Sequence, residues 1–510
     1  MNKLKNNKLQ IEMGFKNVLP QLKAVLFCIA CSFLFLLLFS QTLSPLYRYE
    51  GCDSSVYKIM GLAIIKGKVL YADIFDEKGP VLYLIEAFGQ WLIPGRIGLF
   101  LLANLFLSVA IFCWYKTARI FTTHAKSLVA ILLTLLTYYF YAQRGNLTED
   151  WNITFISVAY YLLLSFFLNE QKKNIVLNGL FIGACLACSF FIRPNDAVSF
   201  IGAPILGVFV WEIKEKRIRE VLGWICGLLL GAALIVAPVV IWFASDNALA
   251  DLWYGIIGFN TKFVSGFGGM LKGGGKMVKF NYLPFIAALL ILAWKSEYPR
   301  TLYIFIPTAI VAYFLLGNRV YLHYWIAWIP ILFFSFWIFA INQENWVTTV
   351  FAVCVFLSIP VFKERKWLDT PVRMFYEVRR DIQYNDSLYE KTAPFFEKMK
   401  ENERDSIWSY NLTWGGDVYN RFNVFVVNRI VPCNRVILFP MEEVDTLLQR
   451  DMDITAARPK YILFSYHDAV PSSYSTRDSL YIQEKYHRIQ SIDNPNIVLY
   501  QRNDEGQDVE

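Results

Sequence analysis

The sequence predicts an α-helical polytopic membrane protein that ends in a small extracytoplasmic α/β domain. Three observations lead to this fold class. The 510 residues are 56% hydrophobic and only 18% charged, whereas soluble domains carry about 25% charged residues. Long apolar runs recur through residues 1–362, and the composition becomes polar in residues 363–510. This composition excludes disordered chains, coiled coils and ordinary soluble enzymes.

Charge-free runs predict about eleven transmembrane helices. Most of them reach the roughly 20 residues that cross about 30 Å of hydrocarbon. The two shortest runs would need flanking residues to complete a crossing. In chain order the runs are 24–47, 97–115, 127–143, 151–169, 174–192, 197–211, 221–245, 280–294, 301–318, 320–343 and 345–362.

The distribution of Lys and Arg predicts the orientation in a plasma (inner) membrane. The N-terminal tail and every second loop are rich in these cations, which favours a cytoplasmic location. The opposite short loops hold single cations, namely Arg144, Arg193 and Arg319. An odd number of spans then places residues 363–510 outside. The net charge of +7 is modest, and cytoplasmic loops account for much of it, so no nucleic-acid partner is expected.

Three non-cytoplasmic segments are much longer than usual connections between bundled helices: 44–96, 246–279 and 363–510. We therefore expect any chemistry on the outer face. The third segment should form the α/β domain, because short β-like runs alternate with helical patterns in it. The β-like runs are 406–410, 424–427, 436–439, 461–464 and 497–500, and the helical patterns are 386–399 and 441–448.

The first outer loop contains two expected amphipathic surface helices. Apolar residues with helical spacing predict one over 54–66, which Gly67 would end, and a second after Pro80. Asp53 precedes the first helix and could cap it, act as a general base, or do both. The turn between the helices carries four charged residues: Asp73, Asp76, Glu77 and Lys78.

Further polar residues lie at other outer ends of the runs. Glu149 and Asp150 open the fourth run, where they suit the helix dipole; carboxylates at a membrane boundary also need a partner. Arg193 and Arg319 could bind lipid headgroups by snorkelling, or stabilise a phosphate. His323 precedes Tyr324 and is more simply a structural histidine than a catalytic one.

Two glycine patterns have different interpretations. The segment 268–276 has the sequence G-G-M-L-K-G-G-G-K, which does not match the spacing of a phosphate-binding loop. A mobile lid over a lipid substrate suits it better. Gly223, Gly227 and Gly231 recur every four residues and predict close helix packing. Only Cys52 and Cys433 fall in polar segments, and the sequence leaves open whether they pair.

Two motifs resemble those of a known group of enzymes. Asp53 is followed by G-K-V-L-Y-A-D-I-F-D-E-K-G-P at residues 67–80, and G-N-L-T-E-D occupies residues 145–150. Together they resemble the GT-C superfamily of integral-membrane glycosyltransferases. The nearest branch is family 39, with the protein O-mannosyltransferases and the lipid A aminoarabinose transferase. This resemblance implies about a dozen spans, a large first outer loop and often an extracytoplasmic C-terminal domain.

The resemblance also implies roles for individual residues. In the family, an acid at the start of the first outer loop activates the acceptor, which matches Asp53. A second acid matches Glu149, with Asp150 as the alternate. A Lys shortly before a Pro faces the lipid phosphate, which matches Lys78, although some relatives have K-P-P where this chain has Lys78-Gly79-Pro80. Asp73, Asp76, His323 and Tyr324 are further site candidates.

The expected activity is transfer of a sugar, with inversion, from a polyprenyl-phosphate donor to an acceptor hydroxyl of a glycan, lipid or protein. A carboxylate would take the proton of the hydroxyl, and Lys78, Arg193 and Arg319 would stabilise the departing phosphate. The scheme requires no cofactor and no metal. One branch of the superfamily does use a divalent cation, which Asp53, Glu149 and Asp150 could hold.

Two other classes of function remain as alternatives. A transporter or flippase of lipid-linked sugars should carry polar residues near the midplane of broken helices, yet ionisable residues are nearly absent from the apolar runs. A non-catalytic membrane scaffold would use the C-terminal domain to bind partners. Release of sugar from a labelled polyprenyl-phosphate donor would distinguish the enzyme from both.

Overall fold

The computed structural model describes residues 2–47, 51–142, 144–169, 174–263, 283–315, 322–343, 396–397, 399–400, 403, 406–410, 453–465, 476–492 and 497–503. The chain divides into two compact units, which are described separately. The first consists of Met1–Ser40, Phe100–Pro238 and Lys262–Thr370, and the second of Gln41–Leu99, Val239–Thr261 and Pro371–Glu510. The expected domain boundary after residue 362 falls outside the described residues and stays a prediction.

Apolar helices build the first unit. It begins with α1 (Asn2–Phe39) and continues with most of α4 (Arg96–Phe121), then α5 (His124–Tyr141), α6 (Thr148–Leu168) and α7 (Ile175–Phe190). After α7 come the short α8 (Pro194–Ala197), η1 (Val198–Gly202), α9 (Ala203–Lys214) and most of α10 (Ile218–Ser245). The last described helices of this unit are α14 (Leu283–Lys295), η3 (Pro299–Thr301), α15 (Leu302–Leu315), η4 (Leu322–Trp328), η5 (Ile329–Phe333) and α16 (Phe334–Ile341).

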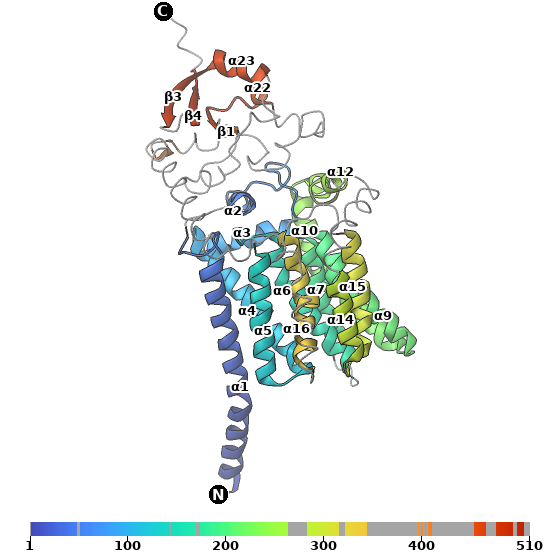
Figure 1. Cartoon of the computed structure of the whole chain (residues 1–510). Coiled ribbons are helices and arrows are strands. Elements are labelled where there is room, and N and C mark those ends of the chain that lie inside the picture. Colours follow the sequence, from blue (N-terminus) through green and yellow to red (C-terminus); the bar gives the residue numbers. More distant parts are fainter. Residues whose placement is uncertain are drawn as a thin grey trace, which may run out of the picture. The chain divides into compact units, whose positions relative to one another are not determined.

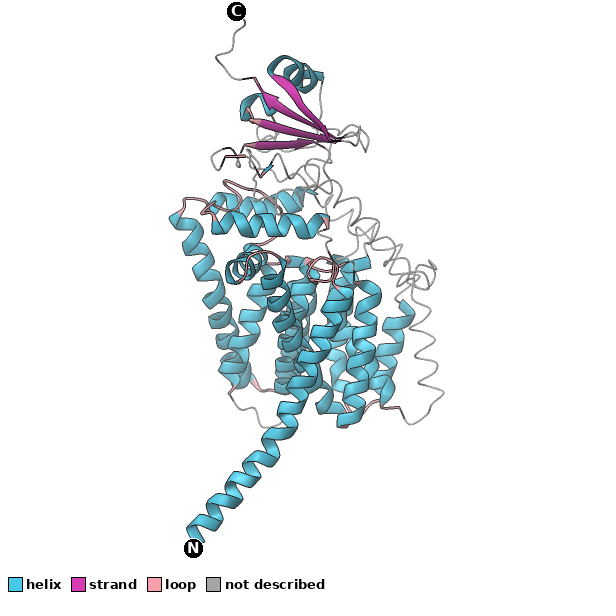
Figure 2. Ribbon diagram, turned by 90° about the vertical axis from the view of Figure 1, so that its left-hand side faces the viewer, coloured by secondary structure: helices cyan, strands magenta, loops and turns pink. Residues whose placement is uncertain are grey.

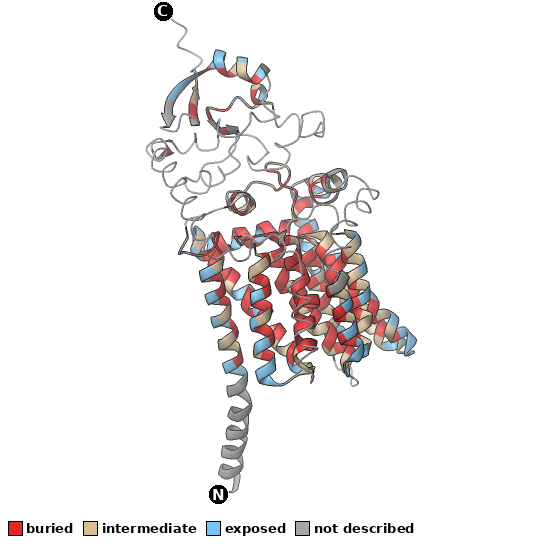
Figure 3. Ribbon diagram, in the orientation of Figure 1, coloured by how far each residue is buried: buried red, intermediate tan, exposed pale blue. Residues whose placement is uncertain are grey.

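The helices α5, α6, α7, α14, α15 and α16 run side by side as a bundle (Figure 1). Their sequences are apolar on nearly every side, which is typical of helices that contact both protein and lipid. Buried residues concentrate on α6 and α16, whereas residues 21–39 of α1 expose much of their surface (Figure 3).

The chain is a multi-pass membrane protein. Six described stretches are long and apolar enough to cross a membrane: Gln21–Phe39, Arg96–Phe121, Thr148–Leu168, Pro194–Lys214, Ile218–Ser245 and His323–Ile341. Three shorter apolar helices, Ile175–Phe190, Phe285–Lys295 and Pro299–Leu315, coincide with further predicted spans, and so does α5. The run 345–362 lies outside the described residues, so the count of eleven stays a prediction.

The glycine repeat on α10 packs closely against α7, as its spacing predicts. A Cβ atom added to Gly227 would lie 2.2 Å from the Val176 carbonyl oxygen, and one added to Gly231 would lie 1.8 Å from that of Leu180. At Gly223 the nearest atom would be 3.7 Å away. Two of the three glycines are therefore required for the close approach of the two backbones.

The second unit contains the two expected helices of the first outer loop, α2 (Cys52–Ile65) and α3 (Pro80–Leu92). The apolar face of α2 is buried, and Gly61 allows the backbone of α3 to approach, because a Cβ there would lie 2.7 Å from the Ala87 nitrogen. The outer side of α3 exposes Phe88 and Trp91, whose rings stack with centroids 6.0 Å apart. Three short helices also belong here, α11 (Leu249–Trp253), η2 (Tyr254–Gly258) and part of α12 (Phe259–Phe263).

The expected α/β character of the C-terminal segment is confirmed by a four-stranded sheet (Figure 2). It contains β1 (Ile407–Tyr410), β2 (Tyr461–Ser465), β3 (Tyr486–Ile492) and β4 (Ile497–Arg502) in the order β1-β2-β4-β3. The β1–β2 pair is parallel and the others are antiparallel. The helices α22 (Ile454–Ala457) and α23 (Thr476–Lys485) pack on it through a core of Trp408, Ile454, Ile462, Ile482 and Tyr486.

Three predicted β-like runs, 406–410, 461–464 and 497–500, are strands. The runs 424–427 and 436–439, the helical pattern 441–448 and nearly all of 386–399 lie outside the described residues. The strand β3 was not predicted, because its sequence Y-H-R-I-Q-S-I is largely polar.

Candidate functional site

The loop before α6 fixes the position of Glu149. Three consecutive residues, Arg144, Gly145 and Asn146, have positive φ angles, which turn the chain sharply into the helix. A side chain at Gly145 would collide with Ser40, because its Cβ would lie 2.3 Å from the Ser40 Oγ. The Trp151 indole N–H donates to the Asn146 Oδ1 over 2.9 Å and holds the loop against the first turn of α6.

Asp150 is bound at both carboxylate oxygens. The Tyr138 hydroxyl donates to its Oδ1 over 2.6 Å, and the Leu147 backbone N–H donates to its Oδ2 over 2.9 Å. The second bond satisfies a backbone donor that the helix leaves without a partner. Asp150 thus anchors the start of α6.

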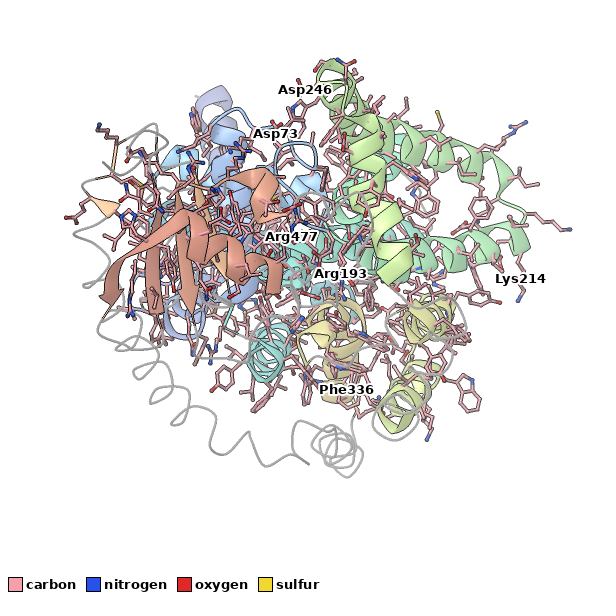
Figure 4. All side chains as sticks on the ribbon, turned by 90° about the horizontal axis from the view of Figure 1, so that it is seen from above. Asp73, Arg193, Lys214, Asp246, Phe336 and Arg477 are labelled. Atoms are coloured by element: carbon pink, nitrogen blue, oxygen red, sulfur yellow. The ribbon has the colours of Figure 1, made fainter. Side chains whose placement is uncertain are left out.

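Glu149 has a different set of partners, all within the first unit. Its Oε1 accepts a hydrogen bond from the Arg193 Nη1, and its Oε2 accepts one from the Thr148 hydroxyl over 2.8 Å. Arg193 also lies 3.3 Å from the Asp196 Oδ1, and the Tyr324 ring covers its guanidinium at 4.0 Å. Arg193 is labelled in Figure 4.

His323 belongs to the same group of residues. It is nearly buried, interacts electrostatically with the Glu149 carboxylate, and its ring meets that of Tyr324 edge to face at 4.9 Å. The structure therefore gathers four predicted site residues into one group, to which it adds Asp196. We call Glu149, Arg193, Asp196, His323 and Tyr324 the Glu149 cluster.

A second polar group lies in the turn before α3, in the second unit. The Tyr83 hydroxyl donates to the Asp76 Oδ2 over 2.5 Å and accepts the Lys78 backbone N–H over 3.1 Å. The Tyr71 hydroxyl donates to the Lys78 carbonyl over 2.5 Å. The Asn260 amide donates to the Glu77 carbonyl over 2.9 Å, which ties the turn to η2 and α12. These bonds hold the backbone of Lys78 in place.

The side chains of this turn form a compact charged group. The Lys78 ammonium lies 2.7 Å from the Glu77 Oε1. Burial raises the pKa of Asp76 well above its usual range, the charge and hydrogen bond of Glu77 raise it further, and Lys78 and Tyr83 oppose the shift. Asp76 therefore tends to keep its proton and donate it to Glu77. A bare phosphate site at Lys78 would require Asp76 and Glu77 to turn away from the ammonium, and they do not turn away.

Asp53 lies in the first turn of α2, and Asp73 lies in the turn that follows this helix. The helix begins at Cys52 with Gly51 as its N-cap, so Asp53 stands within the first turn and the N-cap interpretation is wrong. The Asp53 side chain is half-buried, and among the described residues it has no hydrogen-bond or ion-pair partner. Asp73 is exposed, and its Oδ2 accepts the Val69 N–H over 2.7 Å, so it closes the turn after α2.

Two predicted features fall outside the described residues, namely Arg319 and the glycine-rich segment 268–276. In the described part of the chain, no group of three or more His, Cys, Asp or Glu side chains could hold a metal ion. Tyr71, Tyr83 and Asp196 contact predicted site residues without having been predicted themselves. The positions of Tyr71 and Tyr83 around the turn could have indicated that they contact its charged residues. Asp196, in contrast, is linked to Glu149 through Arg193.

Comparison with known proteins gives two findings. Residues 78–242 match the family model of dolichyl-phosphate-mannose-protein mannosyltransferases, a segment that begins at Lys78 and includes Glu149, Arg193 and Asp196 but not Asp53. The fold is similar to the crystal structure of ArnT from Cupriavidus metallidurans bound to undecaprenyl phosphate. The TM-score is 0.60 at 12% sequence identity, with 94% of this chain and 98% of that chain covered. No curated protein sequence matches significantly. The family match over residues 78–242 and the similarity of fold therefore both agree with the resemblance to GT-C glycosyltransferases that the motifs indicated.

Proposed function

We propose that the chain transfers a sugar from a polyprenyl-phosphate donor to an acceptor hydroxyl on the extracytoplasmic face of the plasma membrane. The observation that carries the proposal is the fold, which it shares over nearly its whole length with an enzyme bound to undecaprenyl phosphate. The family match, to proteins described as using dolichyl-phosphate-mannose, supports the same class of donor. The acceptor is a glycan, a lipid or a protein.

The reaction we propose is a single displacement with inversion. The acceptor oxygen attacks the anomeric carbon, the bond from this carbon to the phosphate oxygen breaks, and the lipid phosphate departs with the bonding electrons. The acceptor proton passes to a carboxylate. Lipid phosphate gains charge as it leaves, so a nearby cation lowers the barrier.

Asp53 suits the role of the general base better than Glu149 or Asp150. A base needs a carboxylate oxygen that can accept a proton from substrate. Asp150 is hydrogen-bonded at both oxygens, and Glu149 is engaged by Arg193 and Thr148. Asp53 is half-buried on the first turn of α2, without such partners among the described residues.

Lys78 suits the role of the phosphate ligand. Its ammonium is the cation of the turn before α3, and its backbone is fixed by two hydrogen bonds, one donated by the Tyr71 hydroxyl and one accepted by the Tyr83 hydroxyl. Glu77 neutralises Lys78 in the resting state, and a phosphate could replace this carboxylate. Arg319 is a second candidate from the sequence.

Sugar transfer by the purified full-length protein tests the proposal. The protein is reconstituted in lipid nanodiscs with radiolabelled polyprenyl-phosphate sugars and a panel of glycan, lipid and peptide acceptors. Asp53→Asn should reduce transfer by about 100-fold or more, since a positioned base contributes roughly 10²–10⁴-fold. Asp246→Asn is the matched control, because Asp246 is an exposed carboxylate of the same unit and should leave the rate unchanged (Asp246 is labelled in Figure 4).

Transfer by the Asn variant at the wild-type rate would show that Asp53 is not the base. Translocation of the intact donor across the bilayer without release of sugar would favour the transporter alternative. Folded protein that does neither with any donor would favour the scaffold.

A further inference from the structure

Asp196 is a fully buried carboxylate on α8, one helical turn after Arg193, and it lies outside the residues to which a role has been given. Its Oδ1 is 3.3 Å from the Arg193 Nη1, and its Oδ2 accepts the Asn152 amide over 3.3 Å. Its backbone N–H donates to the Arg193 carbonyl over 3.1 Å. The side chain of Asp196 thus contacts α6 through Asn152 and its own helix through Arg193.

Glu149 and Asn152 are three residues apart on α6 and therefore lie on the same face of this helix. Glu149 meets Arg193, and Asn152 meets Asp196. The segment 193–196 is consequently fastened to α6 at two successive points. A substitution of Asp196 should therefore alter the position of the Glu149 carboxylate, because both side chains contact the Arg193 guanidinium.

The charges of Glu149, Arg193 and Asp196 do not favour the binding of a phosphate. The formal charges of Arg193, Glu149 and Asp196 sum to +1 − 2 = −1, and His323 interacts with the Glu149 carboxylate beside them. The Arg193 side chain is 13% exposed, whereas those of Glu149 and Asp196 are 2% and 0% exposed, so water screens these acids little. An approaching phosphate would meet the repulsion of these two carboxylates at the Arg193 guanidinium. Lys78, by contrast, pairs with Glu77, and its side chain is 20% exposed and therefore more accessible to a phosphate than that of Arg193.

We infer that Asp196 is a positioning residue. Together with Glu149 it neutralises Arg193, and the resulting clamp fixes the Glu149 carboxylate at the start of α6. The guanidinium is therefore not presented to the donor phosphate. The Tyr324 ring covers one face of the guanidinium and adds to this restraint. The role of Arg193 is then to hold α6 and α8 together at the site. The kinetic part of this inference rests on the proposed sugar transfer, whereas the clamp itself does not.

The first experiment measures the coupling between positions 193 and 196 by unfolding the full-length protein in detergent. The variants are Arg193→Gln, Asp196→Asn and the double substitution. Arg193→Gln leaves two buried carboxylates without their cation and should lower the unfolding midpoint strongly. The double variant should recover a clear part of that loss. Additive effects of the two substitutions would overturn the clamp, and this result does not depend on any ligand.

The second experiment measures binding of undecaprenyl phosphate to the same variants, with Lys78→Gln for comparison. The double variant at 193 and 196 should bind within about twofold of the wild type, whereas Lys78→Gln should weaken binding about tenfold, the loss of one charge-assisted contact. Equal weakening in both would assign Arg193 to the phosphate and overturn the inference. If the wild-type protein does not bind undecaprenyl phosphate, the proposed donor is wrong, and the coupling measurement still decides the clamp.

A third readout separates positioning from general loss of structure. Asp196→Asn preserves the shape of the side chain and the Arg193–Glu149 pair, so the protein should fold. It should lower kcat by roughly 10- to 100-fold, as small misplacements of site groups do, with an unchanged KM for the donor. A raised KM at an unchanged kcat would contradict the positioning role.

Discussion

Substitution of alanine for glycine along α10 should have opposite effects at two positions of the same helix. At Gly231 a Cβ atom would lie 1.8 Å from the Leu180 carbonyl oxygen and 2.9 Å from the Ala184 nitrogen, both of them backbone atoms of α7. At Gly223 the closest atom would be the Ile175 Cγ2 at 3.7 Å. Gly223→Ala is therefore a chemically identical control for Gly231→Ala.

The structure gives the magnitude of this difference. Ordinary van der Waals contact begins at 3.4 Å, so at Gly231 the two helices would have to move apart by up to 3.4 − 1.8 = 1.6 Å. Overpacking of this kind lowers the free energy of unfolding by about 1–3 kcal/mol. Alanine also favours the helix by up to about 1 kcal/mol over glycine at both positions. We expect Gly231→Ala to be less stable than Gly223→Ala by about 1–3 kcal/mol.

Equilibrium unfolding in mixed detergent micelles measures this difference. Tryptophan fluorescence is a suitable signal because Trp224 lies on α10 at this interface, where its indole N–H donates to the Asn178 Oδ1 over 3.0 Å. Sugar transfer should fall along with stability in Gly231→Ala, since α7 leads directly to Arg193. Equal unfolding midpoints for the two alanine variants would refute the assigned packing of α7 on α10.

Three further predictions concern Asp76, Asp150 and metal ions. The pKa of Asp76 is raised in the folded state, so folding binds a proton, and stability should fall as the pH rises from its usual 3.8 through the raised value. Relative to Asp76→Asn, the wild type should gain stability as the pH is lowered through the raised pKa toward 3.8, and parallel plots of the unfolding midpoint against pH would contradict this. Asp150→Ala removes two hydrogen bonds at the start of α6 and should lower the free energy of unfolding by about 2–4 kcal/mol. Unfolding in the same micelles measures this loss, and an unchanged midpoint would refute the anchoring role. Sugar transfer should continue in excess EDTA, and a loss restored by Mg²⁺ or Mn²⁺ would instead support a cation held by carboxylates.

The sequence predicts the helices well because their signal is local. Charge-free runs of sufficient length and helical spacing in the loop 44–96 each depend on neighbouring residues. The start of α2 was missed by two residues, since Gly51 and Asp53 both suit a helix start and only the backbone decides between them. The strand β3 was missed because a polar strand at a sheet edge lacks an apolar pattern.

The contacts within the Glu149 cluster, in contrast to the helices, could not be predicted from the sequence. The pairing of Glu149 with Arg193 spans 44 residues, and one sequence contains no signal for contacts at that distance. The sequence therefore placed Glu149 and Arg193 at helix ends, but it could not indicate that the two side chains pair with each other. The position of Asp196 could not be inferred, because a carboxylate after Arg-Pro-Asn looks like an ordinary turn residue.

The strand order of the C-terminal sheet has a consequence for biosynthesis. The last described strand, β4, lies between β2 and β3, so until residues 497–502 have been added β2 pairs with β1 alone and β3 lacks its neighbour in the sheet. A chain that stops short of Ile497 exposes the backbone edges of two strands, which proteases and chaperones recognise as unfinished. The sheet can close only after residues 497–502 have been synthesised, so its closure is a late step in the folding of this segment.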